Sequence, residues 1–348
     1  MKKTLLTICL VWMCFSLSAQ KIIDLSGKWS FSIDRQDNGE KEKWFSHTLN
    51  DCINLPGSMP EKLKGDEVTA KTQWTGSLYD SSYYYNPYME KYRKEGNIKF
   101  PFFLTPDKHY VGAAWYQKEV NIPADWKGER ILLFLERPHI ETTVWVNGQK
   151  TGMQNSLCVP HQYDITRYVR PGKCTITIRV DNRIKEINVG PDSHSITDQT
   201  QGNWNGIVGR ICLQTTPKTY FDDIQIYPEP EQKLARVKVV IKGAGITKIK
   251  LSAESFNTDK KHIVPAIQQE IKLNKGVTET EMVLPMGNDM LLWDEFHPAL
   301  YKLKAEVTNG KKTEIKEIQF GMRRFEIKGK WFYVNGRKTQ LRGTVENC

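Results

Sequence analysis

The sequence predicts an all-β fold, and three observations support this class. Apolar and polar residues alternate with a period of two in short segments such as "CTITIRV" (174–180) and "YKLKAEV" (301–307). Asn147-Gly148 and Asn335-Gly336 each follow an apolar run, as expected for two-residue hairpin turns whose central residues need positive φ. After the first twenty residues no long stretch of helical periodicity occurs, which excludes a complete barrel of alternating strands and helices.

Length and charge place further bounds on the protein. The chain has 348 residues, of which 39% are hydrophobic, so two domains are expected. Its net charge is +10, but acidic residues lie between the basic ones, as in "KKTEIKEIQ". Because this mixture is typical of solvated strand faces, we expect no nucleic-acid partner.

Residues 1–19 have the composition of a secretory signal peptide. Two lysines precede an apolar run from Leu5 to Leu17, and small residues follow. Cleavage is expected near Ala19 or Gln20. The residues before Cys14 lack the small pair of a lipoprotein site, so we expect a periplasmic or secreted protein without a membrane anchor.

The cysteines after this leader predict neither a zinc site nor a disulfide framework. They are odd in number and show no CxxC spacing, although one pair could still oxidise after export. Two of them lie in apolar strand patterns and are expected to be buried, inert thiols. The five positions are Cys52, Cys158, Cys174, Cys212 and Cys348.

Two strand-rich blocks follow, and a boundary is expected near Pro217. Residues 20–217 suffice for a jelly-roll sandwich, and residues 218–322 for an immunoglobulin-like β-sandwich. Within the first block, residues 74–110 are rich in tyrosine and show no clear period, which indicates a long surface insertion. Residues 323–348 begin with an aromatic hairpin, "FEIKGKWFYVNG".

Several motifs resemble glycoside hydrolase family 2. "AWYQKEVNIPADWKGERILLFLERPHIETTVWVNGQKTG" and "GNWNGIVGRICLQTTP" resemble its N-terminal, galactose-binding-like sugar-binding domain. "LLWDEFHPALYKLKAEV" resembles the end of its immunoglobulin-like domain, and "GMRRFEIKGKWFYVNGRKTQLRGT" the hairpin and first strand that open its (β/α)8 catalytic barrel. The resemblance covers nearly all of the chain after the leader.

This resemblance implies retaining hydrolysis of O-glycosyl bonds in β-glycosides, as in β-galactosidases, by two glutamates about 5 to 5.5 Å apart. In the family both lie on later barrel strands. The sequence contains no Asn-Glu dipeptide, the family's acid/base motif, and it ends as the barrel would begin. We therefore expect the catalytic glutamates to be absent and the chain alone to be inactive.

Asn203, Trp204 and Asn205 are the principal sugar-binding candidates. Planar amides suit sugar hydroxyls, and an aromatic face suits the C–H groups of the ring. In the family this segment lies against the barrel and helps to shape the substrate entrance. The alternative is that Trp204 fills the sandwich core and the two asparagines cap a turn.

Three further residues are candidates for the same site. Family members carry an acidic residue a few positions before the aromatic one, where this chain has Thr200, and Asp198 is a possible substitute. The mismatch leaves a galactoside or glucuronide preference open. His194 could join by hydrogen bonding, or be incidental, and Glu346 could bind sugar in a complete barrel but is expected to be solvated here.

No catalytic carboxylate pair is expected within the chain. Glu136 and Glu141 flank a turn and are interpreted as part of a solvated turn or as a structural ion pair, whereas Asp294 and Glu295 are adjacent and point apart if extended. The histidines have no metal-binding spacing, and nucleophile elbows and phosphate loops are absent, so no cofactor is expected.

Two hypotheses follow from the sequence. The chain is the N-terminal part of an exported family 2 glycoside hydrolase acting on an oligosaccharide or glycoside, or it is a non-catalytic carbohydrate-binding or assembly module of two β-sandwiches. In either case Trp331, Phe332 and Val334 would form an exposed apolar hairpin without a barrel to cover them, which predicts self-association.

Overall fold

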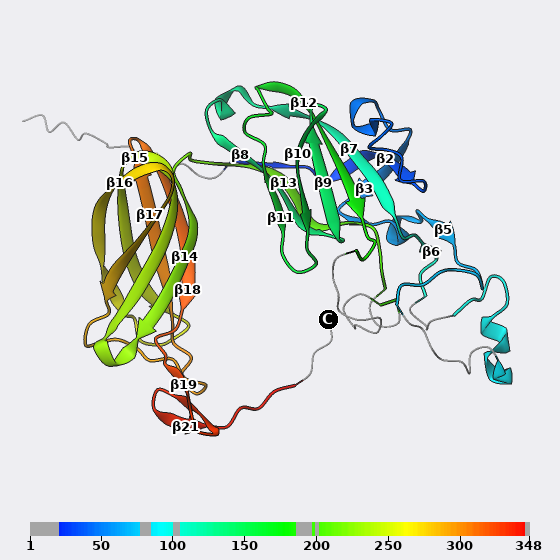
Figure 1. Cartoon of the computed structure of the whole chain (residues 1–348). Coiled ribbons are helices and arrows are strands. Elements are labelled where there is room, and N and C mark those ends of the chain that lie inside the picture. Colours follow the sequence, from blue (N-terminus) through cyan, green and yellow to red (C-terminus); the bar gives the residue numbers. More distant parts are fainter. Residues whose placement is uncertain (1–20, 77–84, 100–104, 186–196, 199–201, 345–348) are drawn as a thin grey trace, which may run out of the picture. The chain divides into compact units, whose positions relative to one another are not determined.

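A computed structural model describes residues 21–76, 85–99, 105–185, 197–198 and 202–344, and it confirms the all-β class (Figure 1). The described chain forms two compact units, residues 21–216 and residues 217–344. Short 3-10 segments interrupt the connections between strands: η1 (Trp44–Ser46), η2 (Pro60–Lys62), η3 (Pro87–Tyr92), η4 (Ala124–Trp126) and η5 (Pro230–Gln232).

The first unit contains two antiparallel sheets. The larger has the strand order β10-β9-β12-β7-β2-β3, and the smaller has the order β1-β13-β8-β11, with β4 pairing to β13. A separate ribbon joins β5 to β6. The strands are β1 (Ile22–Asp24), β2 (Gly27–Asp34), β3 (Asp51–Leu55), β4 (Gly57–Ser58), β5 (Asp66–Glu67), β6 (Lys108–His109), β7 (Ala113–Ile122), β8 (Arg130–Pro138), β9 (Glu141–Val146), β10 (Gln149–Asn155), β11 (His161–Asp164), β12 (Gly172–Asp181) and β13 (Gly206–Thr216).

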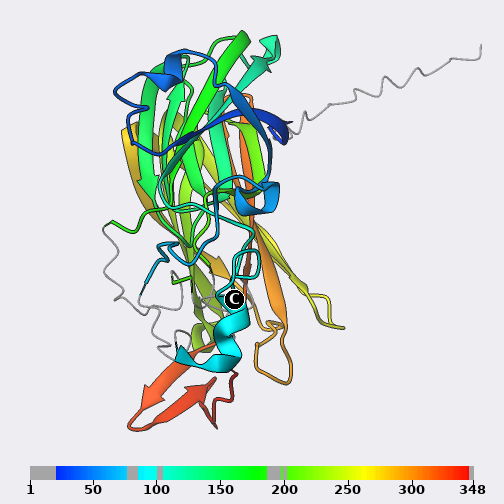
Figure 2. The same ribbon diagram turned by 90° about the vertical axis from the view of Figure 1, so that its right-hand side faces the viewer.

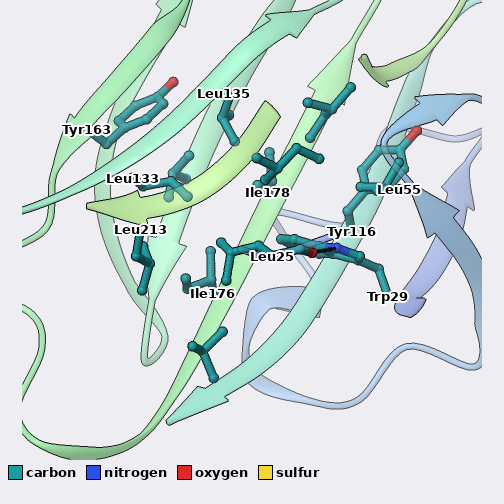
Figure 3. Close-up of a cluster of buried hydrophobic side chains, with 14 of the residues drawn as sticks. Leu25, Trp29, Leu55, Tyr116, Leu133, Leu135, Tyr163, Ile176, Ile178 and Leu213 are labelled. Carbon is teal, nitrogen blue, oxygen red and sulfur yellow. Dashed lines mark hydrogen bonds between the residues drawn. The ribbon is translucent and has the colours of Figure 1, made fainter. Parts of the chain in front are cut away.

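The main core of this unit contains side chains from both sheets (Figure 3). Ile176 and Ile178 come from β12, as their alternation predicts, and Leu213 from β13 of the other sheet. Trp29 is also buried there, and its indole N–H donates to the backbone oxygen of Leu25 at 2.8 Å. Fully burying each such side chain contributes about 1.5–3 kcal/mol.

A second, smaller core covers another part of the large sheet. Trp115 and Trp145 are buried with ring centroids 4.9 Å apart, and Phe45 stacks on Trp145 at 5.2 Å. The indole N–H of Trp115 donates to Asp34 Oδ2. Both faces of β12 are therefore buried, which its alternating pattern alone does not predict.

The second unit is built around a long hairpin with its own hydrophobic core. β15 (Leu234–Phe256) and β16 (Ile263–Pro285) pair along nearly their whole length, with a register shift between Gly243 and Gly245. β14 (Tyr220–Glu229) pairs with the first part of β15, and β17 (Leu300–Asn309) with the second part. β18 (Lys312–Phe320) completes the sheet beside β17.

A small three-stranded sheet, β19 (Phe325–Lys328), β20 (Trp331–Val334) and β21 (Arg337–Thr339), ends the described chain and lies beyond one end of the second sandwich in both views (Figures 1 and 2). Asn335 attaches it to the unit, because its amide donates to the backbone oxygen of Trp293 at 2.9 Å. Trp331 and Phe332 are exposed as expected, but Val334 is 6% exposed, so the expectation of an exposed Val334 was wrong.

Local sequence predictions hold at the turns and the cysteines. Asn147 and Gly148 have φ of 49° and 76°, and Asn335 and Gly336 have φ of 51° and 78°, so both hairpin turns are confirmed. Cys174 and Cys212 are buried free thiols, as expected. Burial raises the pKa of Cys174 to about 11, which keeps it protonated and unreactive.

Candidate functional site

Strand register brings the candidate residues to one end of the first sandwich. In the large sheet, Asp181 at the end of β12 pairs with Ala113 of β7 and Glu141 of β9. In the small sheet, Pro138 of β8 pairs with Ile207 of β13. Only two residues connect the end of β8 to the start of β9, so the paired positions of both sheets lie at the same end of the sandwich. The segment that precedes β13 lies at this end too.

Asn205 lies inside this end of the sandwich, not at its surface. It is 1% exposed, and its Nδ2 donates to the backbone oxygens of Gly112 at 2.9 Å and Val180 at 3.0 Å. Its Oδ1 accepts from the Tyr116 hydroxyl at 2.8 Å. Burial raises the pKa of Tyr116 well above its usual range, which keeps this hydroxyl a donor. The amide that was expected to contact sugar is thus used to join strand ends.

Asp198 and Asn203 form a second buried group that reaches the tyrosine-rich insertion. Asp198 Oδ1 accepts from the Asn203 backbone N–H at 2.5 Å, and Oδ2 accepts from the Thr75 N–H at 2.7 Å. His109 Nε2 lies 3.2 Å from the same Oδ2. The Asn203 amide donates to Thr75 Oγ1 and to the Asn182 backbone oxygen, both at 3.0 Å. Both Asp198 oxygens therefore have partners within the protein.

Trp204, between these two asparagines, is half-buried and has an exposed part. His139, which follows β8, stacks on its ring with centroids 4.5 Å apart and an interplanar angle of 21°. The His139 backbone N–H donates to the Gly206 oxygen at 3.2 Å, which holds the two segments together. Trp204 is thus neither buried in the core nor fully exposed. One face of its ring packs on the imidazole of His139.

His139 is held in its neutral form at this position. It is 8% exposed, and burial lowers its pKa to about 4 against opposing effects of the Asn203 side chain and the Asp198 carboxylate. Within the described ranges, His139 Nε2 and Asn203 Oδ1 are buried atoms without a hydrogen bond of normal geometry. The Trp204 ring is consequently supported by an uncharged imidazole at neutral pH.

A charge cluster with a buried centre lies beside this group at the ends of β9 and β12. Asp181 is fully buried, and it accepts from Arg179 at 3.0 Å and Arg183 at 2.6 Å. Burial alone would raise the pKa of Asp181, but hydrogen bonds from Arg183 and Lys185 outweigh it and hold the pKa well below its usual range. The cluster contains three cations and three carboxylates: Arg179, Arg183, Lys185, Asp37, Glu141 and Asp181.

The sequence-predicted site is therefore brought together only in part. Asp198, Asn203, Trp204 and Asn205 are neighbours, but only Trp204 is partly exposed, whereas the other three are buried. His194 and Glu346 lie outside the described residues. Sequence reasoning missed His139. The one indication available was its place in the short "RPHI" connection between two strands.

The carboxylate pairs considered from the sequence have structural partners. Glu136 accepts from the Arg210 side chain at 2.9 Å, and Glu141 accepts from Lys185 at 2.9 Å. Asp294 accepts backbone N–H groups that follow it, and Glu295 pairs with Arg337 at 2.6 Å. For Glu136 and Glu141 these contacts favour the ion-pair interpretation over the solvated turn.

Among the residues that the structure describes, no group of three or more His, Cys, Asp and Glu side chains is arranged to hold a metal ion. In the same part of the chain, no helix is both long and apolar enough to cross a membrane.

Comparison with known families identifies the class to which this architecture belongs. The family profile described as "Glycosyl hydrolases family 2, sugar binding domain" matches residues 22–217, and "Glycosyl hydrolases family 2" matches residues 219–323. Together they cover most of the chain. The protein belongs to glycoside hydrolase family 2.

Individual relatives are β-glucuronidases and β-galactosidases. A β-glucuronidase of Paenibacillus borealis is 24% identical over 344 residues, which is 93% of this chain and 49% of the relative. A β-galactosidase of Oenococcus oeni is 23% identical over 343 residues, 93% of this chain and 30% of the relative. The chain thus spans about half the length of its curated relatives, or less.

Solved structures show the same fold. The β-glucuronidase from Ruminococcus gnavus in complex with D-glucuronic acid aligns with a TM-score of 0.61 at 18% identity, covering 94% of this chain and 50% of that one. An uncultured Clostridium β-glucuronidase aligns with a TM-score of 0.59 at 20% identity, covering 92% of this chain and 48% of that one.

Proposed function

We propose that this chain is the N-terminal, non-catalytic part of an exported retaining β-glycosidase that acts on a glycoside or oligosaccharide. The observation that carries the proposal is the match of two consecutive family 2 profiles to residues 22–217 and 219–323, which are the two sandwiches. The leader composition of residues 1–19 supports export.

The carboxylates support a non-catalytic role for these residues. Retaining hydrolysis needs two carboxyl groups about 5 to 5.5 Å apart with opposite protonation, one of them unpaired enough to act as nucleophile. Glu141, buried beside Arg179 and Lys185, and Glu136, paired with Arg210, are held as ion pairs instead. We propose that the catalytic glutamates lie outside residues 1–348.

Within this proposal Trp204 is the sugar-facing residue of the first sandwich. Its partly exposed ring can stack on the C–H face of a pyranose, while His139 supports the opposite face and Asn203 and Asn205 fix the backbone on both sides. Asp198 acts by holding the segment. The amides and the carboxylate are positioning residues.

A panel of aryl β-glucuronides, β-galactosides and β-mannosides tests the function. The purified chain without its leader should release no more aglycone than a buffer blank. The protein encoded by a reading frame that continues beyond Cys348 into a barrel should release the aglycone. The sugar that this longer protein prefers then identifies the substrate class. Turnover by the present chain that is lost in Glu141→Gln or Glu136→Gln would contradict the proposal.

The alternative function is a carbohydrate-binding or assembly module. Whether the reading frame encodes a barrel after Cys348 distinguishes this module from the enzyme. If the frame stops without encoding a barrel, hydrolysis is absent in every form of the protein and only sugar binding can remain. Loss of that binding in Trp204→Ala would then support the module.

A further inference from the structure

Residues 68–107 leave the first sandwich and return to the same place. β5 and β6 form a two-stranded ribbon in which Asp66 pairs with His109 and Glu67 with Lys108, so the excursion starts and ends at neighbouring positions. Long excursions of this kind in compact domains are commonly functional. Its described central part is residues 85–99.

Both ends of the excursion are attached to Asp198. Thr75, near its start, donates its N–H to Asp198 Oδ2 at 2.7 Å and accepts the Asp198 N–H at 3.1 Å. His109, at its end, places Nε2 3.2 Å from the same oxygen, and Trp74 packs edge-on against the His109 ring at 4.7 Å. The carboxylate that holds the Trp204 segment therefore also holds the base of the excursion.

The central part exposes aromatic rings to an unusual degree. Tyr88 is 84% exposed and Tyr85 is 71% exposed, the two largest values among the large hydrophobic side chains of the described chain. Tyr88 lies in η3, whose first turn is fixed by Asn86, because the Asn86 side chain accepts from the Tyr88 N–H at 3.0 Å. Such rings present their faces to solvent at little entropic cost on binding.

The same residues carry an excess of positive charge. Residues 85–99 include four basic and two acidic side chains, so their net charge is +2 in fifteen residues, a higher density than the +10 of the 348-residue chain. Glu90 Oε1 lies 3.4 Å from Lys94 Nζ, so these two charges offset each other. Lys91 lies over the Tyr92 ring at 4.8 Å, so cation and aromatic groups are adjacent.

We propose that residues 85–99 form a binding surface for an acidic, uronate-bearing oligosaccharide. Tyr85 and Tyr88 would stack on sugar rings, and Lys91 and Lys99 would pair with carboxylates. The proposal rests on the proposed function, because the excursion is tied through Asp198 to the sugar-binding segment. The interspersed acids and this attachment favour a glycan over a nucleic acid.

Oligogalacturonate titrated into the leaderless chain by calorimetry tests the surface, with the fully methyl-esterified oligomer as the neutral probe. The acidic oligomer should bind more tightly, and added salt should weaken it. Tyr88→Ala should weaken binding about fivefold, the loss of one aromatic contact. Lys91→Ala combined with Lys99→Ala should reduce the salt dependence. Tyr227→Ala, which removes a 50% exposed tyrosine of the second unit, is the matched control and should bind like the wild type.

Equal affinity for the acidic and esterified oligomers, or unchanged binding in Tyr88→Ala, would overturn the proposal. Single-stranded DNA that competes equally with the acidic oligomer, and whose binding depends on the same residues, would also overturn the proposal. Aglycone release by the extended reading frame is a separate readout. If the longer protein releases aglycone but oligogalacturonate binding does not depend on Tyr88, only the proposed binding surface is overturned. If binding depends on Tyr88 but no aglycone is released, the binding surface is supported and the proposed enzymatic function is refuted.

Discussion

At the scale of single residues, His139 determines how Trp204 is presented. Its imidazole lies flat on the indole and is kept neutral by burial, although Asp198 and Asn203 favour the charged form. Protonation would place a positive charge on a side chain that is only 8% exposed, and Asp198 and Asn203 do not compensate fully for this burial. The support of Trp204 should therefore weaken in acid.

His139→Phe tests this dependence, because phenylalanine keeps a ring beneath Trp204 and removes the titration. The folded pKa of about 4 lies below the ordinary value of about 6.5, so the unfolded chain takes up the proton first as the pH falls. This contribution to stability is complete above about pH 6.5 and is lost toward pH 4. The unfolding free energy should fall by about 2 kcal/mol between pH 7 and pH 5 from this residue.

Urea unfolding of both proteins, followed by tryptophan fluorescence, measures the difference. Data at pH 8, where histidine is neutral in both states, give the packing cost of the substitution itself. The decline in unfolding free energy from pH 7 to pH 5 should then be smaller in His139→Phe. Parallel curves for the two proteins would show that His139 does not titrate as described.

The residue types of the candidate site could be predicted from sequence, but their directions could not. "GNWNG" predicts an unusual loop with one aromatic and two amides. Whether the Asn205 amide faces sugar or protein depends on Gly112 and Val180, which are far away in the sequence and close only after β7 and β12 pair. The same holds for Asp198, whose partner Thr75 is 123 residues away.

At the scale of elements, the approach of β13 to β4 depends on a glycine. Gly206 has φ of +148°, and a Cβ built there would lie 2.5 Å from the Gly57 oxygen and 2.8 Å from Ser58 Cα. Both contacts are with backbone atoms of β4, which cannot move without breaking its pairing to β13. The start of β13, two residues after Trp204, is thus fixed against β4.

Gly206→Ala should therefore destabilise the first unit by about 3 kcal/mol or more, through steric clash and an unfavourable φ. Gly202→Ala is the matched control in the same segment, because φ there is +73° but a Cβ meets nothing within 4 Å among the described residues. It should cost only about 1 kcal/mol. Similar urea midpoints for the two variants would contradict the close approach.

Elements determined by local chemistry were the ones that sequence predicted well. The Asn147-Gly148 and Asn335-Gly336 turns need only positive φ at two neighbouring residues, and both occur where expected. The exposure of Val334 was predicted wrongly because burial is a property of the surroundings. Asn335, the residue after Val334, is held to the Trp293 backbone oxygen of the same unit, a contact that the sequence does not reveal.

At the scale of the whole molecule, the small sheet β19-β20-β21 is the surface through which we predict self-association. Phe325, Ile327, Trp331 and Phe332 are 50%, 68%, 43% and 36% exposed. Phe325, Ile327 and Phe332 share one face of the sheet, where the rings of Phe325 and Phe332 stack with centroids 5.5 Å apart, and such clustered exposed apolar side chains favour association. We expect the leaderless chain to self-associate reversibly through this sheet.

Sedimentation velocity over a range of concentrations tests the association. Ile327→Lys combined with Phe332→Lys should shift the protein toward monomer, whereas Ile246→Lys, at a 65% exposed position of β15, should not. A chain ending after Arg324 should also be monomeric and still folded, because Met322, which is fully buried in the second core, is retained. Identical profiles for all forms would count against the sheet as the interface.

The pairing of β1 with β13 has a consequence for how the protein is made. Ile22 pairs with Gln214, so one edge of the small sheet is completed by residues at opposite ends of the first unit. During synthesis, nearly the whole unit must leave the ribosome before that edge can close, and contacts of such high sequence separation form slowly. Until then the nascent chain carries open strand edges, which a holding chaperone must cover or further elongation must pair.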